Sequence, residues 1–241
     1  MVKAPRVQAG TRLYAIGDIH GRADLLKALH SLICEDAGRH HATRNVVVYL
    51  GDYVDRGPQS RDVVDLLLDE PLPNFEAVHL KGNHEDSMLR FLAKPSVGPA
   101  WISYGGAATL ISYDVSPPET TASPAELARA QAELARRLPE RHRKFLGSLP
   151  LTHTEGDYFF VHAGVRPGVA IDQQAEQDLL WIRSEFLSSD KDFGKVVVHG
   201  HSITERPDVQ RNRIGIDTGA FASDTLTCLV LEDTDCSFLQ T

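Results

Sequence analysis

The chain has 241 residues, of which 42% are apolar, and a net charge of −8, so it is long enough to bury the core of one globular domain. An acidic chain disfavours general binding to nucleic-acid backbones or anionic membranes, and we expect no stable nucleic-acid complex and no membrane partner. The three cysteines form no paired or metal-binding motif, and no apolar run has the length of a bilayer span, which predicts a cytoplasmic location.

The first ninety residues or so predict an order of strand, loop and helix that occurs three times. Apolar and β-branched runs predict strands at residues 12–17, 45–50 and 75–80. Each strand is followed by a helical pattern, at residues 22–37, 60–68 and 84–92. This order is typical of an α/β fold.

The middle of the chain has a different composition. Residues 95–113 are rich in glycine and aromatic side chains, and residues 116–123 form a Pro/Thr/Ser loop. Ser123 and Glu126 have the spacing of a capping box, which predicts a helix at residues 124–138. We expect one domain over residues 1–241, in which a helical and loop segment at about 95–149 forms a cap beside the site.

The last third of the chain predicts mainly strands. Their ranges are residues 158–161, 195–198, 213–216 and 226–231. Together with the first half, this pattern predicts a layered α/β architecture in which two packed sheets are flanked by helices.

Five short segments at the ends of these strands carry metal-ligand side chains beside glycine. They are GDIHG (17–21), GDYVDRG (51–57), KGNHE (81–85), VHAG (161–164) and VHGHS (198–202). A mixture of imidazole, carboxylate and amide donors suits Mn²⁺, Fe or Zn²⁺. The five segments therefore predict a centre of two divalent metal ions, with Mn²⁺ preferred.

Spacing indicates which side chains can act together. Residues two apart on an extended strand end point the same way, so Asp18 and His20 can approach one ion. Asp52 follows a buried strand directly, where a carboxylate can bridge two cations, and Asn83 offers a neutral amide oxygen.

A second ion needs histidines from more distant strand ends. His162 fits this role because it follows an apolar run. His199 and His201 are alternatives in the next segment. We assign His201 as the ligand because the chain turns out of the strand there, and we expect His199 to be either a residue of the inner shell around the site or a packing residue.

This ordered set, from Gly17 to about Ala220, resembles the PPP-type serine/threonine protein phosphatases of the calcineurin-like metallophosphoesterase superfamily, particularly the bacterial and phage members. The resemblance implies a central β-sandwich of two mixed sheets flanked by helices. The Gly-His-Ser step at 200–202 looks like the Gly-His-Thr step of the family. By this resemblance, the ligands are Asp18, His20 and Asp52 for one ion, and Asp52, Asn83, His162 and His201 for the other.

Two close cations lower the pKa of a bridging water, and we expect the resulting hydroxide to attack phosphorus directly. His84 is the candidate for protonating the leaving oxygen, since imidazole titrates near neutral pH. Asp55 would orient His84 and favour its charged form. Such a His–Asp pair also occurs in the family that the chain resembles.

Three cationic residues are candidates for binding the substrate. Arg56 lies beside Asp55, and Arg183 looks like the second phosphate arginine of the family. A guanidinium fork matches two phosphate oxygens better than an ammonium does. Lys81 stands where many protein phosphatases of this family have arginine, which is a departure from their pattern.

The sequence leaves three functions open. The preferred hypothesis is a phosphomonoesterase acting on phosphoserine or phosphothreonine in proteins, because symmetrical dinucleoside tetraphosphatases typically have Ala in place of Asp55. The alternative is a hydrolase of dinucleoside polyphosphates or RNA 5′ ends, which Lys81 and the YGGAATL segment (104–110) keep open. A catalytically inactive metal-binding scaffold is the third, and the His84–Asp55 pair disfavours it. The oligomeric state and the native metal pair stay open.

Overall fold

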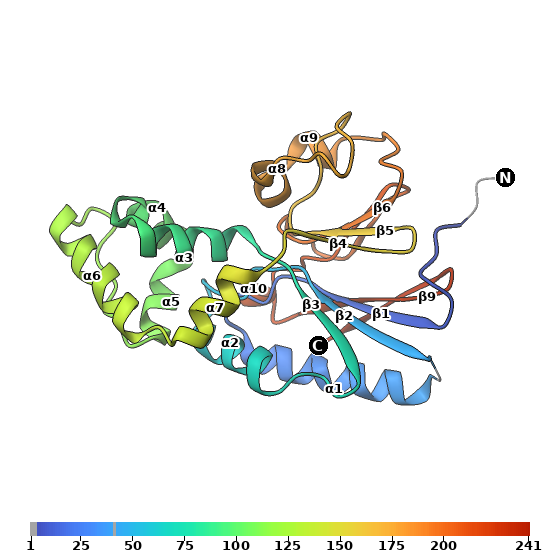
Figure 1. The fold of residues 1–241 in the computed structure, drawn as a ribbon, viewed down its shortest axis with the longest axis horizontal. Helices are drawn as coiled ribbons and strands as arrows, with labels where there is room; N and C mark the ends of the chain where they lie inside the picture. Colours follow the sequence, from blue (N-terminus) through green and yellow to red (C-terminus); the bar gives the residue numbers. More distant parts are fainter. Residues whose placement is uncertain (1–3, 41) are drawn as a thin grey trace.

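The computed structural model describes residues 4–40 and 42–241. Its centre consists of two five-stranded sheets packed face to face, with helices on their outer faces and at one end (Figure 1). This is the layered α/β arrangement that the sequence predicts, so the predicted fold class is confirmed.

The first sheet has the strand order β10-β9-β1-β2-β3 and the second has β4-β5-β6-β8-β7. In the first, β1, β2 and β3 are parallel, β9 pairs antiparallel with β1, and β10 pairs antiparallel with β9. In the second, β5, β6 and β8 are parallel. The strands are β1 (Thr11–Ile16), β2 (Arg44–Tyr49), β3 (Phe75–His79), β4 (Thr152–Glu155), β5 (Tyr158–Val161), β6 (Val196–His199), β7 (Asp208–Val209), β8 (Arg213–Gly215), β9 (Thr227–Glu232) and β10 (Asp235–Gln240).

Successive side chains along a strand point to opposite faces of its sheet and so belong to different apolar clusters. In β1, Leu13 and Ala15 belong to the apolar cluster between the sheets, whereas Tyr14 and Ile16 belong to the cluster beneath the outer helices. In β5, Phe160 belongs to the cluster between the sheets. All of these side chains are fully buried. Because a strand buried on both faces cannot slip by one residue without exposing apolar groups, this packing fixes the register.

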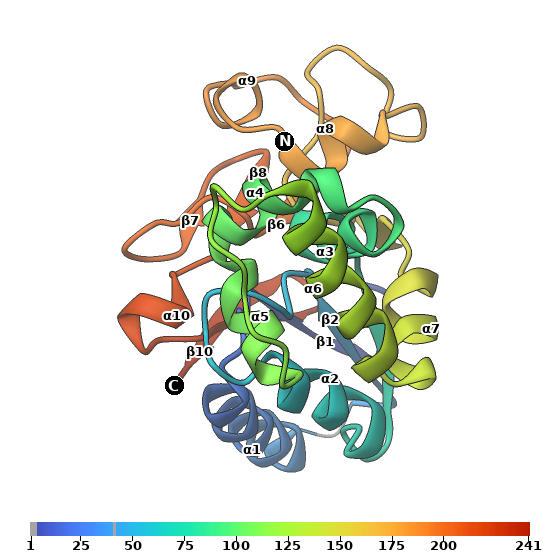
Figure 2. The same cartoon turned by 90° about the vertical axis from the view of Figure 1, so that its left-hand side faces the viewer.

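All helices except the short α10 lie in three places (Figures 1 and 2). Helices α1 (Ala23–Arg39) and α2 (Ser60–Asp69) cover the first sheet, and α8 (Glu176–Trp181) and α9 (Ser184–Leu187) cover the second. A block of helices occupies one end, and the short α10 (Ala220–Ser223) precedes β9. The block contains α3 (Asn83–Ala93), η1 (Pro95–Val97), α4 (Gly98–Trp101), η2 (Ile102–Gly106), α5 (Ala107–Ser112), α6 (Pro124–Arg137) and α7 (Glu140–Ser148).

The longer predicted elements agree with the structure to within about two residues. Helix α6 begins with the predicted capping box, in which the Ser123 amide donates to Glu126 Oε2 at 2.8 Å. Helix α7 was not predicted because its charged residues hide the apolar period, and the polar β4 and β10 were not predicted for the same reason. Every helix in the described part of the chain is too short or too polar to cross a membrane.

Candidate metal centre

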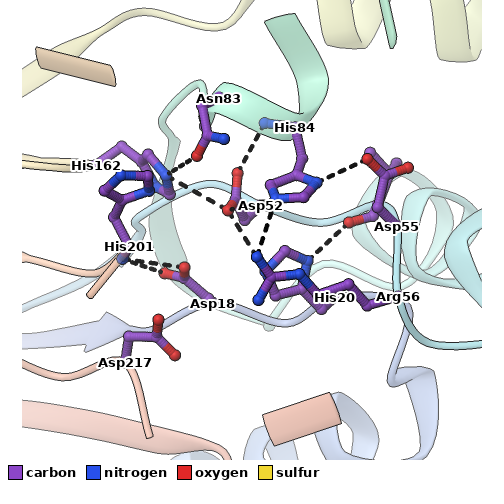
Figure 3. A network of polar contacts seen from close by, with 12 residues as sticks. Asp18, His20, Asp52, Asp55, Arg56, Asn83, His84, His162, His201 and Asp217 are labelled. Atoms are coloured by element: carbon purple, nitrogen blue, oxygen red, sulfur yellow. Dashed lines mark hydrogen bonds and ion pairs between the residues drawn. The ribbon is translucent and has the colours of Figure 1, made fainter. Parts of the chain in front are cut away.

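The five sequence segments meet at one edge of the two sheets, because the carboxyl ends of parallel strands lie side by side. Two groups of side chains form there: His20 with Asp52 and His84, and Asp52 with His162 and His201. Within each group the potential ligand atoms lie within 4.8 Å of one another, and Asp52 belongs to both (Figure 3).

The Asp52 carboxylate lies at the junction of the two groups. Its Oδ2 is 3.5 Å from His20 Nε2, 3.4 Å from His162 Nε2 and 3.8 Å from His84 Nε2. Its Oδ1 accepts a hydrogen bond from the His84 amide at 3.0 Å. A carboxylate shared in this way has the position that a bridging ligand requires.

The histidine rings are oriented by backbone carbonyls. His20 Nδ1 lies 2.9 Å from the carbonyl oxygen of Val54, and His162 Nδ1 lies 2.9 Å from that of Leu50. Each Nδ1 must therefore carry a proton and donate it, which leaves the lone pair on Nε2 facing Asp52. The Nε2 atoms of His20 and His201 are buried and have no hydrogen-bond partner among the described residues. Unpartnered inward lone pairs fit metal binding.

Electrostatics favour neutral imidazoles at these positions. Burial lowers the pKa of His20 to about 3 and that of His201 to about 2. Burial also lowers the pKa of His162. All three rings are therefore neutral at physiological pH, which is the form that binds a metal ion.

Asp18 lies beside the two groups without belonging to either. Both of its oxygens accept from the His201 amide, at 3.2 and 3.0 Å. Burial, together with the nearby carboxylates of Asp217 and Asp52, raises its pKa well above the usual value. No Lys or Arg forms an ion pair with these three carboxylates in the described part of the chain. Bound cations would supply the missing positive charge.

The Asp-Thr-Gly triplet at 217–219 suggests, in the sequence, a strand-ending turn near the rim of the site. Asp217 does follow β8, but it lies inside the centre and not at its rim. Asp217 is only 1% exposed and faces Asp18 (Figure 3). Burial raises its pKa to about 6. Its strand-ending position was visible in the sequence, but its depth depends on how the second sheet packs against the first.

Asn83 is the first residue of α3. Its Oδ1 lies 2.8 Å from His162 Nε2. Since the proton of His162 is on Nδ1, these two atoms both present lone pairs, an arrangement that a cation between them would stabilise. Asn83 could therefore offer its amide oxygen to a cation held beside His162.

The structure distinguishes His201 from His199. The ring of His201 is directed to Asp52 and His162, whereas His199 packs edge-on against Phe186, with ring centroids 5.0 Å apart. Gly200 between them has no room for a side chain, because a Cβ there would lie 2.0 Å from Asp18 Oδ1.

His84 differs from the other histidines of the centre. Its Nδ1 donates to Asp55 Oδ2 at 2.7 Å. Burial acts to lower the pKa of His84, but the carboxylates of Asp52 and Asp55 outweigh it and raise the pKa above the usual value. A histidine that retains its proton beside the neutral ones suits a general acid.

The three cationic side chains that are predicted to bind the substrate lie in different surroundings. Arg56 Nη2 is 3.3 Å from His84 Nε2, and its guanidinium lies over the ring of Phe221. Arg183 Nη1 donates to the carbonyl oxygen of His201 at 2.9 Å, so the two arginines approach different groups of the centre. Lys81 Nζ instead lies 4.0 Å from a carboxylate oxygen of Glu176.

Glu85 was not singled out from the sequence, yet its buried carboxylate organises the loop that carries Asp52. It accepts from the amides of Asp52 at 2.8 Å and Tyr53 at 2.8 Å, and from Gly82 at 2.9 Å. The available signal was its place in the first turn of α3, from which a glutamate can reach back to the helix start.

Backbone strain is concentrated at this centre. Nine non-glycine residues in the described chain have positive φ, and five of them are candidate site residues. Such conformations cost about 1–3 kcal/mol each and persist only where the surroundings enforce them. The five are His20 (46°), Asp52 (53°), Asp55 (73°), Arg56 (67°) and His201 (62°).

The calcineurin-like phosphoesterase family matches residues 11–221. The chain belongs to this family. Family membership implies divalent metal ions, and the two ligand groups around Asp52 are suited to hold them.

Relatives within the family differ in activity. An asymmetrical bis(5′-nucleosyl)-tetraphosphatase PrpE of Anoxybacillus flavithermus is 27% identical over 234 residues, covering 89% of this chain and 88% of the relative. Serine/threonine-protein phosphatase 2 of Escherichia coli is 36% identical over 95 residues, which is 39% of this chain and 38% of that protein. The crystal structure of a candidate diadenosine tetraphosphatase, 22% identical, covers 99% of this chain and is itself covered over 98%, with a TM-score of 0.63.

Replacing His201 by Ala should lower the affinity for one of two manganese ions by about tenfold or more, because a ligand is lost. His199→Ala is the matched control and should change this affinity by less than about threefold, because His199 packs away from Asp52. Metal content after dialysis against a manganese series measures both. A larger loss in His199→Ala would overturn the assignment.

Replacing Glu85 by Gln should lower the free energy of unfolding by about 2–3 kcal/mol, because an amide nitrogen cannot accept from the loop amides. Urea denaturation in the presence of EDTA measures this without a contribution from metal ions. Glu119→Gln, at an exposed position, is the control and should stay within about 0.5 kcal/mol. Equal stability of the two variants would remove the structural role given to Glu85.

Proposed function

We propose that this protein hydrolyses the phosphoanhydride bonds of dinucleoside polyphosphates of the diadenosine tetraphosphate class. The observation that carries the proposal is the similarity to asymmetrical bis(5′-nucleosyl)-tetraphosphatases along almost the whole of both chains. The sequence alone favoured a protein phosphatase, and the extent of this similarity supports the nucleotide alternative better.

Two divalent cations are part of the proposal, with Mn²⁺ preferred for the mixed nitrogen and oxygen donors. When bound, such ions supply Lewis-acid activation of water and neutralise phosphate charge. The residues proposed to hold them are Asp18, His20 and Asp52 for one ion, and Asp52, Asn83, His162 and His201 for the other.

The side chains around the centre would bind and orient the substrate. Arg56 approaches one ligand group and Arg183 the other, so a polyphosphate chain lying across the centre meets a guanidinium on each side. Lys81, next to Glu176, would contribute only to more distant parts of the substrate. His84, held by Asp55, would give the proton on its Nε2 to the leaving oxygen.

A second candidate function is the hydrolysis of phosphoserine or phosphothreonine in proteins. The buried His84–Asp55 pair favours it, because an alkoxide leaving group is far more basic than a phosphate and depends more on a proton donor. The local similarity to a serine/threonine-protein phosphatase agrees with this candidate. The same pair disfavours an inactive metal-binding scaffold.

We also propose that residues 1–241 act as one metallophosphoesterase domain with a cap at about 95–149. Apolar side chains of this segment, among them Trp101 and Leu134, belong to the same cluster as Tyr14 of β1. A cytoplasmic location is proposed because Cys34, Cys228 and Cys236 are free thiols, as expected in a reducing compartment.

The manganese-loaded protein should hydrolyse diadenosine tetraphosphate with a kcat/KM at least about a hundredfold above that for a phosphothreonine peptide or a 5′-triphosphorylated RNA. Chromatography of the nucleotides should give ATP and AMP in equal amounts, the outcome of asymmetrical cleavage. A preference for the phosphothreonine peptide would establish the second candidate instead, and two molecules of ADP would exclude the asymmetrical assignment.

A further inference from the structure

The carboxylate of Asp55 accepts hydrogen bonds from three buried side chains. Oδ2 accepts from His84 Nδ1 at 2.7 Å and from Trp101 Nε1 at 2.8 Å, and Oδ1 accepts from Thr109 Oγ1 at 2.6 Å. Asp55 and Thr109 are 0% exposed and Trp101 is 2% exposed. Two of the three donors therefore come from the segment 95–149, which the sequence predicts to be a cap beside the site.

The same segment also holds the backbone of the Asp55–Arg56 step. The Asp55 amide donates to Thr109 Oγ1 at 2.8 Å, and the Arg56 amide donates to the Gly105 carbonyl oxygen at 3.1 Å. Asp55 and Arg56 have φ values of 73° and 67°, which are strained for residues with a side chain. These contacts supply the outside constraint that such a conformation needs.

Two glycines make this close approach possible. A Cβ on Gly106 would lie 2.5 Å from Trp101 Cδ2, and a Cβ on Gly105, whose φ is 117°, would lie 2.8 Å from the Arg56 amide nitrogen. In the sequence, the YGGAATL segment was a feature that kept a nucleotide substrate open. In the structure, its glycines and Thr109 lie against Trp101 and the Asp55–Arg56 step.

We propose that Trp101 and Thr109 are positioning residues that fix Asp55 and, through it, the ring of His84, while the Gly105 carbonyl fixes Arg56. This inference rests on the proposed hydrolytic function, in which His84 protonates the leaving oxygen. It makes the helical block at the end of the sheets part of the catalytic apparatus (Figure 2).

The consequence of losing either donor follows from burial. A buried carboxylate that loses one partner moves toward the donors that remain, so the His84 ring loses its fixed orientation. A misplaced acid impairs reactions that need a proton on the leaving oxygen and affects activated leaving groups little. The rate should therefore fall more for substrates with poor leaving groups than for substrates with activated ones.

The first measurement compares phenyl phosphate, a poor leaving group, with p-nitrophenyl phosphate, an activated one, in the manganese-loaded protein. Thr109→Val and Trp101→Phe keep the size or the aromatic packing and delete one donor each. Both should lower kcat for phenyl phosphate by about tenfold to a hundredfold, and kcat for p-nitrophenyl phosphate by less than about threefold. His84→Ala should show the same selectivity more strongly.

Two variants serve as matched controls. Thr109→Ser retains the hydroxyl and should keep the ratio of the two kcat values near that of the unmodified protein. Tyr113→Phe removes another buried hydroxyl of the helical block, one that contacts His142 and not Asp55. It should leave the ratio unchanged, which separates a positioning role from a general loss of stability.

The second measurement needs no turnover. In zinc-loaded protein with ¹⁵N-labelled histidine, the Nδ1 proton of His84, assigned by its absence in His84→Ala, should exchange slowly with water. Exchange should be at least about tenfold faster in Thr109→Val and Trp101→Phe, and unchanged in Thr109→Ser and Tyr113→Phe.

The outcomes are separable. This inference alone would be overturned by the following results. In Thr109→Val and Trp101→Phe, the exchange rate of the His84 Nδ1 proton would be unchanged and kcat would fall equally for both substrates. His84→Ala would still lower kcat selectively for phenyl phosphate. Equal losses in His84→Ala would remove the acid role, and with it the inference. A preference for a substrate other than a dinucleoside polyphosphate would overturn the proposed function and leave the positioning roles supported.

Discussion

The arrangement of the centre depends on one buried carboxylate. Asp52 is 1% exposed, lies within 3.8 Å of three imidazoles and has a left-handed backbone. Glu85 holds the loop that carries Asp52 by accepting hydrogen bonds from successive amides of that loop. Strand β2, which precedes this loop, is buried on both faces. Two of these imidazoles, those of His20 and His162, are neutral, so the buried charge of Asp52 is costly, and added cations would offset it.

The same burial has opposite consequences for neighbouring histidines. Around His20 and His201 desolvation prevails and the pKa falls, which leaves lone pairs for metal ions. Around His84 two carboxylates prevail and the pKa rises, which retains a proton. The difference in role therefore arises from Asp55, and Asp55 is in turn held by side chains of the helical block.

The sequence was sufficient for the fold class, and the candidate ligands that it singled out lie together at one edge of the sheets. Parallel strands bring their carboxyl ends to one edge, so polar side chains at those ends can be predicted to meet. Helix α7 and the edge strands β4 and β10 escaped prediction because most of their side chains are polar or partly exposed, which leaves no clear apolar period. The depth of Asp217 likewise depends on sheet packing.

The contacts of Asp55 show most clearly what could not be predicted from the sequence. Trp101 and Thr109 lie 46 and 54 residues from Asp55 along the chain, and no local sequence pattern predicts that both contact its carboxylate. The neighbouring glycines were recognisable as a motif. The sequence does not show, however, whether such a glycine leaves room for an indole ring or for a substrate. Long-range approach of this kind becomes apparent only in the folded chain.

The shared position of Asp52 is tested most directly by the metal content and the electron paramagnetic resonance spectrum of the manganese-loaded protein. Two ions that share the Asp52 carboxylate should give two manganese per chain and an exchange-coupled signal, and Asp52→Asn should lose the coupling or one ion. A single ion per chain, or two ions without coupling in the unmodified protein, would contradict the account.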